Sequence, residues 1–346
     1  MTAPLLSVEN LQVHYRTGAP TGAPTGGGVV RAVDGATLSV EAGSILGLVG
    51  ESGCGKTTLG RAVMGVLPDA GRIAGGRVVF EGADLVAMTE AQQRAVRWRR
   101  LSFIPQTAMN ALDPVQRLRA QMLEVLMERG GLARAAAHTR AEELFRMVGL
   151  DPVRLSDYPH QFSGGMRQRA SIALALALNP AMVIADEPVT ALDVIVQRQV
   201  LDVIRELQAR LGLAMILVTH DMAVVAYACD RVAVMYAGII VESGAVREVL
   251  ERPLHPYTMG LTHAFPDVHG EVSELVPIDG SPPSLISPPP GCRFAPRCPF
   301  AEERCHTTPP PPVTADDHMV ACWRADDAPA LRALAAKPAT WAEMAS

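Results

Sequence analysis

The residues that point most directly to chemistry lie in a glycine-rich segment, residues 50–58 (Gly-Glu-Ser-Gly-Cys-Gly-Lys-Thr-Thr). Glycines at positions 50, 53 and 55 let the backbone turn its N–H groups toward the oxygens of a polyphosphate. Lys56 is then placed to reach the β and γ phosphates, and the hydroxyl of Thr57 to bind Mg²⁺. The alternative is a glycine-rich turn with a surface lysine. The spacing favours a phosphate-binding loop, and with it a nucleotide hydrolase.

Two carboxylates and a histidine follow two other apolar segments. Asp186 and Glu187 come directly after the run 182–185, and His220 closely follows the run 214–218. Ligands bind at the carboxyl edge of the sheet in open α/β folds, so we expect these side chains beside the phosphate loop. Asp186 would hold Mg²⁺ through water, Glu187 would orient or deprotonate the attacking water, and His220 would contact the γ-phosphate. The alternatives are a solvated acidic strand end and a structural histidine.

This chemistry requires a scaffold of parallel strands, and the sequence contains short apolar runs of suitable length. Residues 44–49 predict a buried strand that ends at the phosphate loop, and residues 59–67 predict the helix after it. The N-terminus of that helix adds a favourable dipole for negative charge. The runs 182–185 and 214–218 predict neighbouring strands of the same sheet. Residues 17–28 predict a low-complexity loop.

Two regions of different texture divide the chain. Residues 1–245 alternate strand-like and helix-like patterns, which predicts an α/β nucleotide-binding domain with a hairpin over residues 231–242, turned at Ala237-Gly238. Between residues 90 and 161 the pattern becomes helical, which predicts a helical subdomain at about residues 107–165. Residues 246–346 form an extension rich in proline and cysteine.

Composition narrows the possible classes of protein. The chain has 31 lysine and arginine residues against 36 acidic residues, a formal charge of -5, so it offers no overall positive field for nucleic acid. Residues 5–15 alternate like a strand and lack the charged start and apolar run of a signal peptide, which predicts a cytosolic protein. The most apolar stretch, residues 172–185, is interrupted by Asn179-Pro180 and is shorter than the about 20 residues that cross a bilayer. Any membrane association is therefore expected through a partner.

A second glycine motif lies at residues 162–169 (Phe-Ser-Gly-Gly-Met-Arg-Gln-Arg). Ser163 and the two glycines after it can offer a hydroxyl and N–H groups to an anion, although such a turn can also be only a helix cap. With this motif between the phosphate loop and the carboxylates, the chain resembles the ATP-binding subunits of ATP-binding cassette (ABC) transporters. Their usual motif is Leu-Ser-Gly-Gly-Gln, from which Phe162 and Met166 depart; methionine is familiar there in the peptide-importer branch.

The resemblance implies an ABC-type fold and roles for further residues. Gln106 matches the glutamine that contacts Mg²⁺ and couples the site to the membrane subunits, Asp193 lies in the loop that crosses the dimer interface, and Tyr15 matches the aromatic residue that stacks on adenine. Two cassettes of the family join head to tail, so each ATP lies between one chain's phosphate loop and its partner's second motif. The implied nucleotide-binding set is Tyr15, Gly50, Glu51, Ser52, Gly53, Cys54, Gly55, Lys56, Thr57, Thr58, Ser163, Gly164, Gly165, Met166 and Asp193, the catalytic set is Glu187, His220, Lys56 and Gln106, and the Mg²⁺ set is Thr57, Gln106 and Asp186.

The extension bears on the substrate class. Residues 255–261, 278–283 and 291–299 look like the C-terminal region of oligopeptide and dipeptide permease ATPases. That resemblance implies a peripheral subunit on the cytoplasmic face of the membrane. Its expected partners are a second ATPase subunit, either a copy or a homologue, two permease subunits and an extracytoplasmic solute-binding protein. Related nickel importers share parts of this tail, so nickel or another small solute is the alternative.

Four cysteines of the extension form a candidate metal site. They are Cys292, Cys298, Cys305 and Cys322. Their spacing lacks the tight Cys-x-x-Cys pairs of common zinc sites and differs from the best-known iron–sulfur patterns, while a cytosolic setting argues against disulfides. A similar cluster in this permease branch holds a four-iron four-sulfur centre, so the resemblance implies [4Fe-4S]. Zinc, with His306 or His318 as a possible ligand, and buried thiols without metal are the alternatives.

The sequence therefore predicts an ATP-hydrolysing subunit that powers the import of oligopeptides or dipeptides, with ATP driving the dimerisation of two cassettes. The rival of another class is a soluble ABC ATPase that acts on the ribosome or nucleic acid. A single cassette, the lack of a long heptad segment and the lack of strong positive charge argue against that rival. A regulatory partner with an idle site is a third hypothesis, against which the intact Glu187 and His220 argue.

Overall fold

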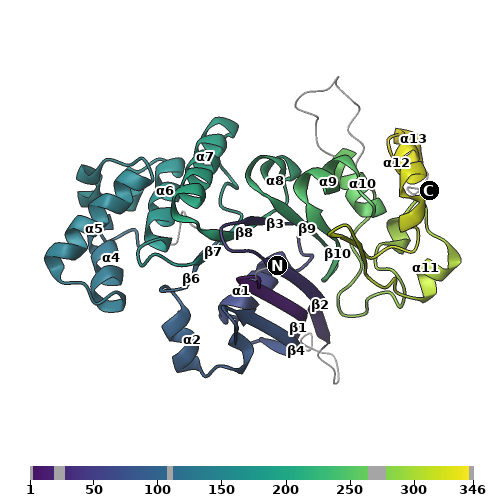
Figure 1. Cartoon of the computed structure of the whole chain (residues 1–346), viewed down its shortest axis with the longest axis horizontal. Coiled ribbons are helices and arrows are strands. Elements are labelled where there is room, and N and C mark those ends of the chain that lie inside the picture. The colour runs from purple at the N-terminus through teal and green to yellow at the C-terminus, as the bar shows by residue number, and fades with distance from the viewer. Residues whose placement is uncertain (1–2, 19–27, 107–111, 264–277, 343–346) are drawn as a thin grey trace.

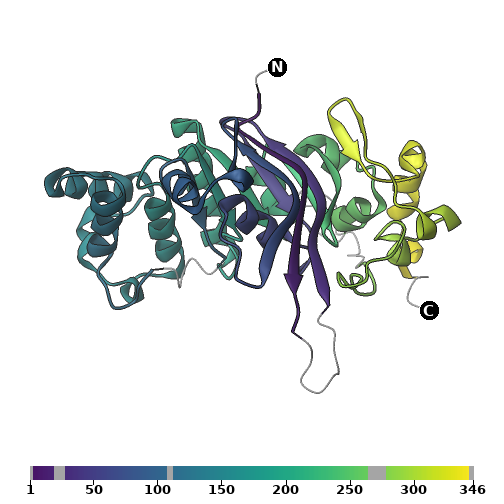
Figure 2. The same cartoon turned by 90° about the horizontal axis from the view of Figure 1, so that it is seen from below.

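Two sheets lie at the centre of the molecule, which we describe from a computed structural model covering residues 3–18, 28–106, 112–263 and 278–342 (Figures 1 and 2). In these ranges the larger sheet has the strand order β11-β12-β10-β9-β3-β8-β7-β6, and the smaller sheet has the order β2-β1-β4-β5. Most of the predicted low-complexity loop at 17–28 lies outside the described residues. The helical region and the extension lie on opposite sides of the two sheets (Figure 1).

The elements have the following bounds. The strands are β1 Leu6–Arg16, β2 Val29–Val40, β3 Ile45–Val49, β4 Gly71–Phe80, β5 Ala83–Asp84, β6 Leu101–Ile104, β7 Met182–Asp186, β8 Ala214–Thr219, β9 Arg231–Tyr236, β10 Ile239–Ala245, β11 Val313–Ala315 and β12 His318–Val320. The helices are α1 Lys56–Met64, α2 Glu90–Val96, α4 Leu118–Glu124, α5 Arg134–Met147, α6 Gly164–Ala175, α7 Val194–Leu211, α8 Met222–Ala228, α9 Val246–Glu251, α10 Pro256–His263, α11 Glu303–Thr307, α12 Ala328–Ala335 and α13 Pro338–Ala342. Short helical turns are η1 Leu85–Ala87, η2 Val125–Arg129, η3 Pro152–Ser156, η4 Pro159–Gln161, η5 Ala295–Arg297 and η6 Ala325–Asp327.

The centre of the larger sheet is parallel. β3, β7 and β8 are buried along their whole length, which is why their sequences are continuous apolar runs. β8 pairs in parallel with both β3 and β7, and β6 pairs in parallel with β7. The prediction that the strands before Asp186 and His220 are neighbours is confirmed.

The predicted hairpin and the predicted first helix are present, with one shift in bounds. β9 and β10 pair antiparallel on either side of Ala237-Gly238, as expected. α1 begins at Lys56 rather than at residue 59, and it ends at Met64 rather than at residue 67 because Gly65, with φ 63, forms a left-handed cap.

The helical pattern predicted between residues 90 and 161 is wrong at one segment. Residues 101–104 form β6, whose Ile104 lies opposite Ala185 of β7. Four residues are too few for a stable helix, but they are enough to add one strand to the edge of a parallel sheet. This strand carries the chain to Gln106.

Three apolar clusters hold the layers together. One lies between the larger sheet and the helices α4 to α7, and a second lies between the two sheets around α1. The third joins β9 and β10 to the extension and contains Tyr236, Tyr257 and Phe294. It therefore takes residues from both sides of the boundary that we predicted at residues 245/246, a boundary that stays a prediction. In the described part of the chain, no helix is both long enough and apolar enough to cross a membrane.

Candidate nucleotide site

Four segments with polar residues leave the larger sheet at one edge. Val49, the last residue of β3, lies opposite Thr219 of β8, and Val218 lies opposite Asp186 of β7. β6 ends level with Ala185, so Gln106 follows at the same edge. Because parallel strands end together here, the phosphate loop, Asp186, Glu187 and His220 all emerge at the carboxyl edge of the sheet.

The backbone of the phosphate loop depends on its glycines at two positions. Gly55 has φ 110, and a Cβ added there would overlap the carbonyl oxygen of Ala32. A Cβ at Gly50 would overlap the carbonyl oxygen of Met235. Gly53 has φ 78 with open space around its missing Cβ, so only its conformation favours glycine.

The loop closes around the ammonium group of Lys56. Nζ of this buried residue donates hydrogen bonds to the carbonyl oxygens of Gly50 at 2.7 Å and Glu51 at 2.9 Å. Its positive charge is therefore fixed at the centre of the loop, where α1 also begins. Burial raises the pKa of the Cys54 thiol, which stays protonated and offers no thiolate chemistry.

Thr57 and Asp186 place two oxygen atoms next to each other beside the loop, where both could act as metal ligands. Oγ1 of Thr57 donates to Oδ1 of Asp186 at 3.1 Å. Asp186 is only 1% exposed, and its Oδ2 has no hydrogen-bond partner among the described residues. Burial, and secondly the charge of Glu187, raise the pKa of Asp186. A buried oxygen without a partner and a neighbouring hydroxyl fit the ligand preference of Mg²⁺.

Glu187 is held by three side chains. Nε2 of Gln106 and Oγ1 of Thr190 each donate to Oε2 at 3.0 Å, and Nδ1 of His220 lies 3.4 Å from Oε1. Burial alone would raise the pKa of Glu187, but the hydrogen bonds from Thr190, Gln106 and His220 outweigh it and lower the pKa. The carboxylate is therefore ionised and oriented. Its backbone, with φ 48, lies in the left-handed region that side chains seldom adopt.

Sequence reasoning did not identify Thr190. It lies in a turn three residues after Glu187, and its amide N–H donates to the carbonyl oxygen of Glu187 at 3.3 Å. No spacing rule marks such a residue, since a hydroxyl in a loop is common and its partner is set by the turn.

The second glycine motif lies at the start of α6 and follows a short helical turn rather than a strand of the larger sheet. Oγ of Ser163 accepts a hydrogen bond from the amide of Met166 at 3.4 Å and so caps the helix. Gly165 allows close packing, because a Cβ there would overlap the side chain of Val196 on α7. Asp193 caps α7, with Oδ1 accepting from the amide of Val196 at 3.0 Å. In a single chain these residues therefore have structural roles.

Tyr15 lies at the end of β1 close to the phosphate loop. Its hydroxyl is 3.5 Å from Oγ1 of Thr58, and its ring fills the space beside Gly71. Of the other predicted nucleotide-binding residues, Glu51 and Ser52 lie within the loop, Thr58 lies in the first turn of α1, and Gly164 and Met166 lie in the first turn of α6.

The four cysteines of the extension line one pocket, together with Trp323 and Pro310. All four are free thiols. Burial raises the pKa of Cys292 and Cys298, and raises that of Cys322 to about 12. Among the residues that the structure describes, no group of three or more His, Cys, Asp or Glu side chains is arranged to hold a metal ion. His318, which we named as a possible zinc ligand, contacts Glu242 instead, with Nε2 2.7 Å from Oε1.

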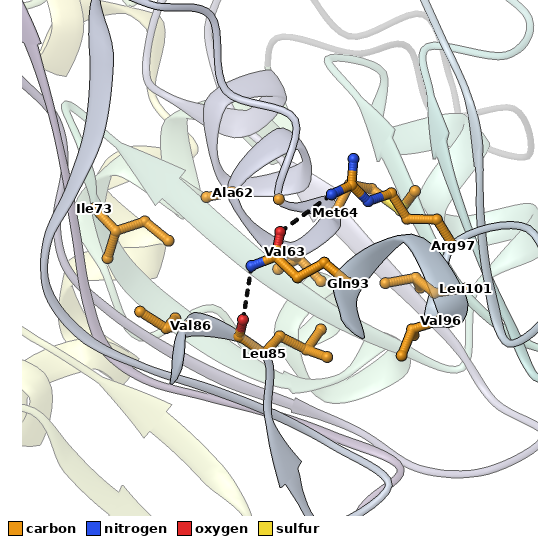
Figure 3. Close-up of a pocket in the computed structure, with 11 residues that line it drawn as sticks. Ala62, Val63, Met64, Ile73, Leu85, Val86, Gln93, Val96, Arg97 and Leu101 are labelled. Atoms are coloured by element: carbon orange, nitrogen blue, oxygen red, sulfur yellow. Dashed lines mark hydrogen bonds between the residues drawn. The ribbon is translucent and has the colours of Figure 1, made fainter. Parts of the chain in front are cut away.

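Two hollows on the cassette differ in size and chemistry. The pocket in Figure 3 has a volume of about 20 Å³, too small for a nucleotide, and it lies between α1 and α2 around Gln93, which donates to the carbonyl oxygen of Leu85 at 2.8 Å. It contains none of the predicted site residues.

A broader groove of about 660 Å³ runs between β6 and the helical region, lined by Trp98, Phe103 and Pro105. It lies one residue from Gln106.

The strand, loop and helix with carboxylates at the same sheet edge define a nucleotide-binding protein of the phosphate-loop class. Residues 33–190 match the family model described as ABC transporter, and residues 241–305 match the model described as oligopeptide/dipeptide transporter, C-terminal region. The first match lies within the cassette, and the second runs from β10 into the first part of the extension.

Relatives of known name place the chain more narrowly. It is 42% identical over 326 residues to the dipeptide transport ATP-binding protein DppD of Bacillus subtilis, with 93% of this chain and 95% of that protein covered. It is 42% identical over 322 residues to the oligopeptide transport ATP-binding protein OppD of Salmonella typhimurium, with 92% and 93% covered. The chain therefore belongs to the oligopeptide and dipeptide transport ATP-binding proteins of the ABC ATPase family, and the predicted family is confirmed.

A solved structure supports the fold. The dimeric structure of a bacterial ABC transporter cassette matches with a TM-score of 0.60 and 24% identity, over 70% of this chain and 99% of that one. At this identity the likeness shows the fold alone. It confirms the predicted α/β ABC-type nucleotide-binding domain with its helical subdomain. ATP and Mg²⁺ fit such an ATPase.

Proposed function

We propose that this chain is the ATP-hydrolysing subunit of an importer of oligopeptides or dipeptides. One observation carries the proposal: Glu187 is held by Gln106, Thr190 and His220 at the sheet edge where the phosphate loop ends. An oriented, ionised carboxylate beside a phosphate-binding loop is what activation of water requires. The names of the relatives supply the solute class.

The chemistry follows from the groups at the edge. The loop N–H groups and Lys56 bind the β and γ phosphates and stabilise the charge that develops during transfer. Thr57 and Asp186 would hold Mg²⁺, which neutralises phosphate charge when bound, with the amide oxygen of Gln106 as a further ligand. Glu187 takes the proton of the attacking water, and His220 contacts the γ-phosphate and the water.

A second cassette completes the site. Asp193 is followed by Val194 and Ile195, whose exposed fractions are 81% and 73%. Two neighbouring apolar side chains this exposed favour burial against another chain. Ser163 and Gly164 of each copy would then contact the nucleotide that the other copy binds, as the family's head-to-tail dimer implies. ATP closes this dimer and hydrolysis allows it to reopen.

The membrane partners would attach at the groove beside Gln106. Its lining by Trp98 and Phe103 offers an apolar surface to a segment of a permease subunit. This position gives ATP hydrolysis a route to the permease through β6. The subunit would be peripheral on the cytoplasmic face, with two permease subunits and an extracytoplasmic solute-binding protein as partners.

The cysteine pocket supports a second proposal, a [4Fe-4S] cluster bound by Cys292, Cys298, Cys305 and Cys322. The support is that these four residues, separated along the chain, line one pocket, and binding would require their side chains to move from the arrangement described above, which is not suited to a metal ion. Zinc is the alternative ligand. Anaerobic purification followed by iron, sulfide and zinc analysis and a visible absorption spectrum tests both. A colourless, metal-free extension that stays folded would contradict both.

Reconstitution tests the function. The chain should co-purify from its native membrane with permease and solute-binding subunits. Vesicles that contain this complex should take up labelled dipeptides or oligopeptides when ATP is supplied on the ATPase side. Uptake of nickel without peptide uptake would favour the small-solute alternative. Co-purification with ribosomes or nucleic acid instead would favour the soluble ABC ATPase.

A further inference from the structure

The extension contacts the phosphate loop through an arginine–carboxylate pair. Nη1 of Arg297 lies 2.8 Å from Oε2 of Glu51, and Nη2 lies 3.0 Å from Oε1. The two residues are 246 positions apart in the chain. The side chain of Arg297 is 6% exposed and that of Glu51 is 24% exposed, so water screens this pair only partly. A two-pronged pair of this kind fixes orientation as well as charge.

The guanidinium group is itself held by the extension and by β9. Nε donates to the carbonyl oxygen of Asp279 at 2.8 Å, and Nη2 donates to that of Ile278 at 2.9 Å. Nη1 also lies 3.2 Å from the hydroxyl of Tyr236. Burial alone would lower the pKa of Arg297, but the hydrogen bonds with Glu51 and Tyr236 outweigh it and raise the pKa. The charge is therefore retained in a fixed position.

A second contact holds the backbone of the same loop residue. The hydroxyl of Tyr257, on α10, accepts a hydrogen bond from the amide of Glu51 at 2.9 Å. The ring of Tyr257 is fully buried, with its centroid 4.6 Å from that of Tyr236 and 5.4 Å from that of Phe294. Main chain and side chain of Glu51 are thus both held by the extension.

An indirect contact reaches the middle of the loop, at Cys54. Arg293 of the extension donates to the carbonyl oxygen of Ala237 and pairs with Asp34. Gly238, which follows Ala237 in the chain, donates from its amide to the carbonyl oxygen of Cys54 at 2.8 Å. The turn between β9 and β10 therefore joins the extension to the loop at a second point.

Glu51 places a negative charge within a loop whose ligand is a polyanion. Without a compensating cation this charge would repel the β and γ phosphates. We propose that Arg297 and Tyr257 are positioning residues of the ATP site, through which the extension neutralises the Glu51 carboxylate and fixes the loop in its binding conformation. The inference rests on ATP binding at residues 50–58. It assigns the extension a direct part in setting ATP affinity.

The test is ATP affinity and turnover in the assembled transporter, with purified full-length chain as a second sample. Arg297→Gln should raise the KM and the Kd for ATP roughly tenfold, with a smaller effect on kcat, because one uncompensated charge then lies in the loop that binds the nucleotide. The combined variant Glu51→Gln with Arg297→Gln removes both charges and should return the affinity to within roughly threefold of wild type. Tyr257→Phe should raise KM by a few-fold, since one neutral hydrogen bond to the loop is lost.

A matched control lies elsewhere in the extension. Asp317 forms a similar two-pronged pair with Arg231 of β9, away from the phosphate loop. Asp317→Asn should weaken the attachment of the extension but leave the KM for ATP unchanged. If Arg297→Gln does not fold, Arg297→Lys can be tested instead. Lysine keeps the positive charge but cannot contact both oxygens of Glu51 as the guanidinium group does, so it should give a smaller rise in the KM for ATP.

Three outcomes would overturn the proposal. They are unchanged affinity in Arg297→Gln, equal losses in Arg297→Gln and Asp317→Asn, and no recovery in the combined variant. Failure of the wild-type chain to bind ATP would instead contradict the proposed function, before any variant is compared.

Discussion

At the scale of single residues, the charge and orientation of Glu187 determine the chemistry that the site can perform. Three hydrogen bonds lower the pKa of this carboxyl, although burial opposes them. A base that is already ionised at neutral pH and fixed in orientation can accept a proton from water as the phosphoryl group is transferred. The left-handed backbone of Glu187, with φ 48, is tolerated because the surrounding turn holds it.

Glu187→Gln should keep ATP binding and lose turnover by roughly 10²–10⁴-fold, the usual contribution of a general base. The amide has nearly the same shape but cannot accept the proton from water. ATPase assays on the assembled transporter, together with nucleotide titration, measure the two effects. Glu248→Gln, at a partly exposed glutamate paired with Arg252, is the control and should leave turnover and ATP binding unchanged. Turnover that is unchanged in Glu187→Gln would remove this residue from the catalytic role.

Asp186→Asn should abolish the part of ATP affinity that depends on Mg²⁺. The amide can still accept the hydrogen bond from Thr57, but its neutral oxygen is a weaker ligand for a divalent cation. Nucleotide titration with Mg²⁺ and with chelator measures this. The variant should bind equally in both, at the affinity that the wild type shows with chelator. A full Mg²⁺ effect in the variant would contradict the assignment.

At the residue level, the sequence predicted the placement of a side chain correctly where that side chain directly follows a buried strand. Asp186, Glu187 and His220 come at or just after the ends of two neighbouring parallel strands. The pattern of an apolar run followed by polar residues was therefore enough to predict that they lie close together. Thr190 and Arg297 could not be found in that way. Thr190 acts through a turn, and the partner of Arg297 lies 246 positions away, beyond any local pattern.

At the scale of elements, the phosphate loop is shaped by its neighbours as much as by its own sequence. The carbonyl oxygens of Ala32 on β2 and Met235 on β9 leave no room for side chains at Gly55 and Gly50. The sequence motif predicts the loop and the helix. The neighbouring strands determine at which glycines a side chain would clash. β6 was mistaken for helix because four residues give too short a window for periodicity to separate helix from strand.

Gly55→Ala and Gly53→Ala form a matched pair of variants two residues apart in this loop. Gly53→Ala meets open space and should cost about 1–2 kcal/mol from the left-handed backbone alone. Gly55→Ala adds overlap with the backbone of Ala32, so it should cost more and weaken ATP binding further. Urea denaturation and nucleotide titration measure the difference. Equal losses in the two variants would show that the overlap is relieved by movement of β2.

At the scale of the whole molecule, the extension and the cassette share one apolar cluster. Val49 and Val234 of the sheet lie in the same cluster as Phe294, Leu331 and Trp341 of the extension. Composition alone indicated a boundary near residue 245, since proline and cysteine become frequent after it. Composition could not show that the tail packs on the edge of the sheet, because that depends on contacts between distant segments.

Phe294→Ala should destabilise the whole chain by about 3–5 kcal/mol, the usual cost of removing a buried aromatic side chain. Its ring is 1% exposed and lies 5.2 Å from Tyr236 of the cassette, centroid to centroid. Urea unfolding followed by fluorescence and circular dichroism should show one transition at a lower midpoint. Val313→Ala, at a residue 55% exposed, is the control and should change little. A separate early transition with an unaffected cassette would mean that the two parts unfold independently.

We have proposed that ATP is bound by residues 50–58 of this chain and enclosed by the Ser-Gly-Gly motif of a second cassette. A cryo-electron microscopy map of the assembled transporter, prepared with the Glu187→Gln variant and ATP with Mg²⁺, tests it most directly. We predict nucleotide density between the phosphate loop of one cassette and the second glycine motif of the other. A closed pair of cassettes with no nucleotide between those segments, or with nucleotide bound elsewhere, would show that the proposed ATP site is wrong.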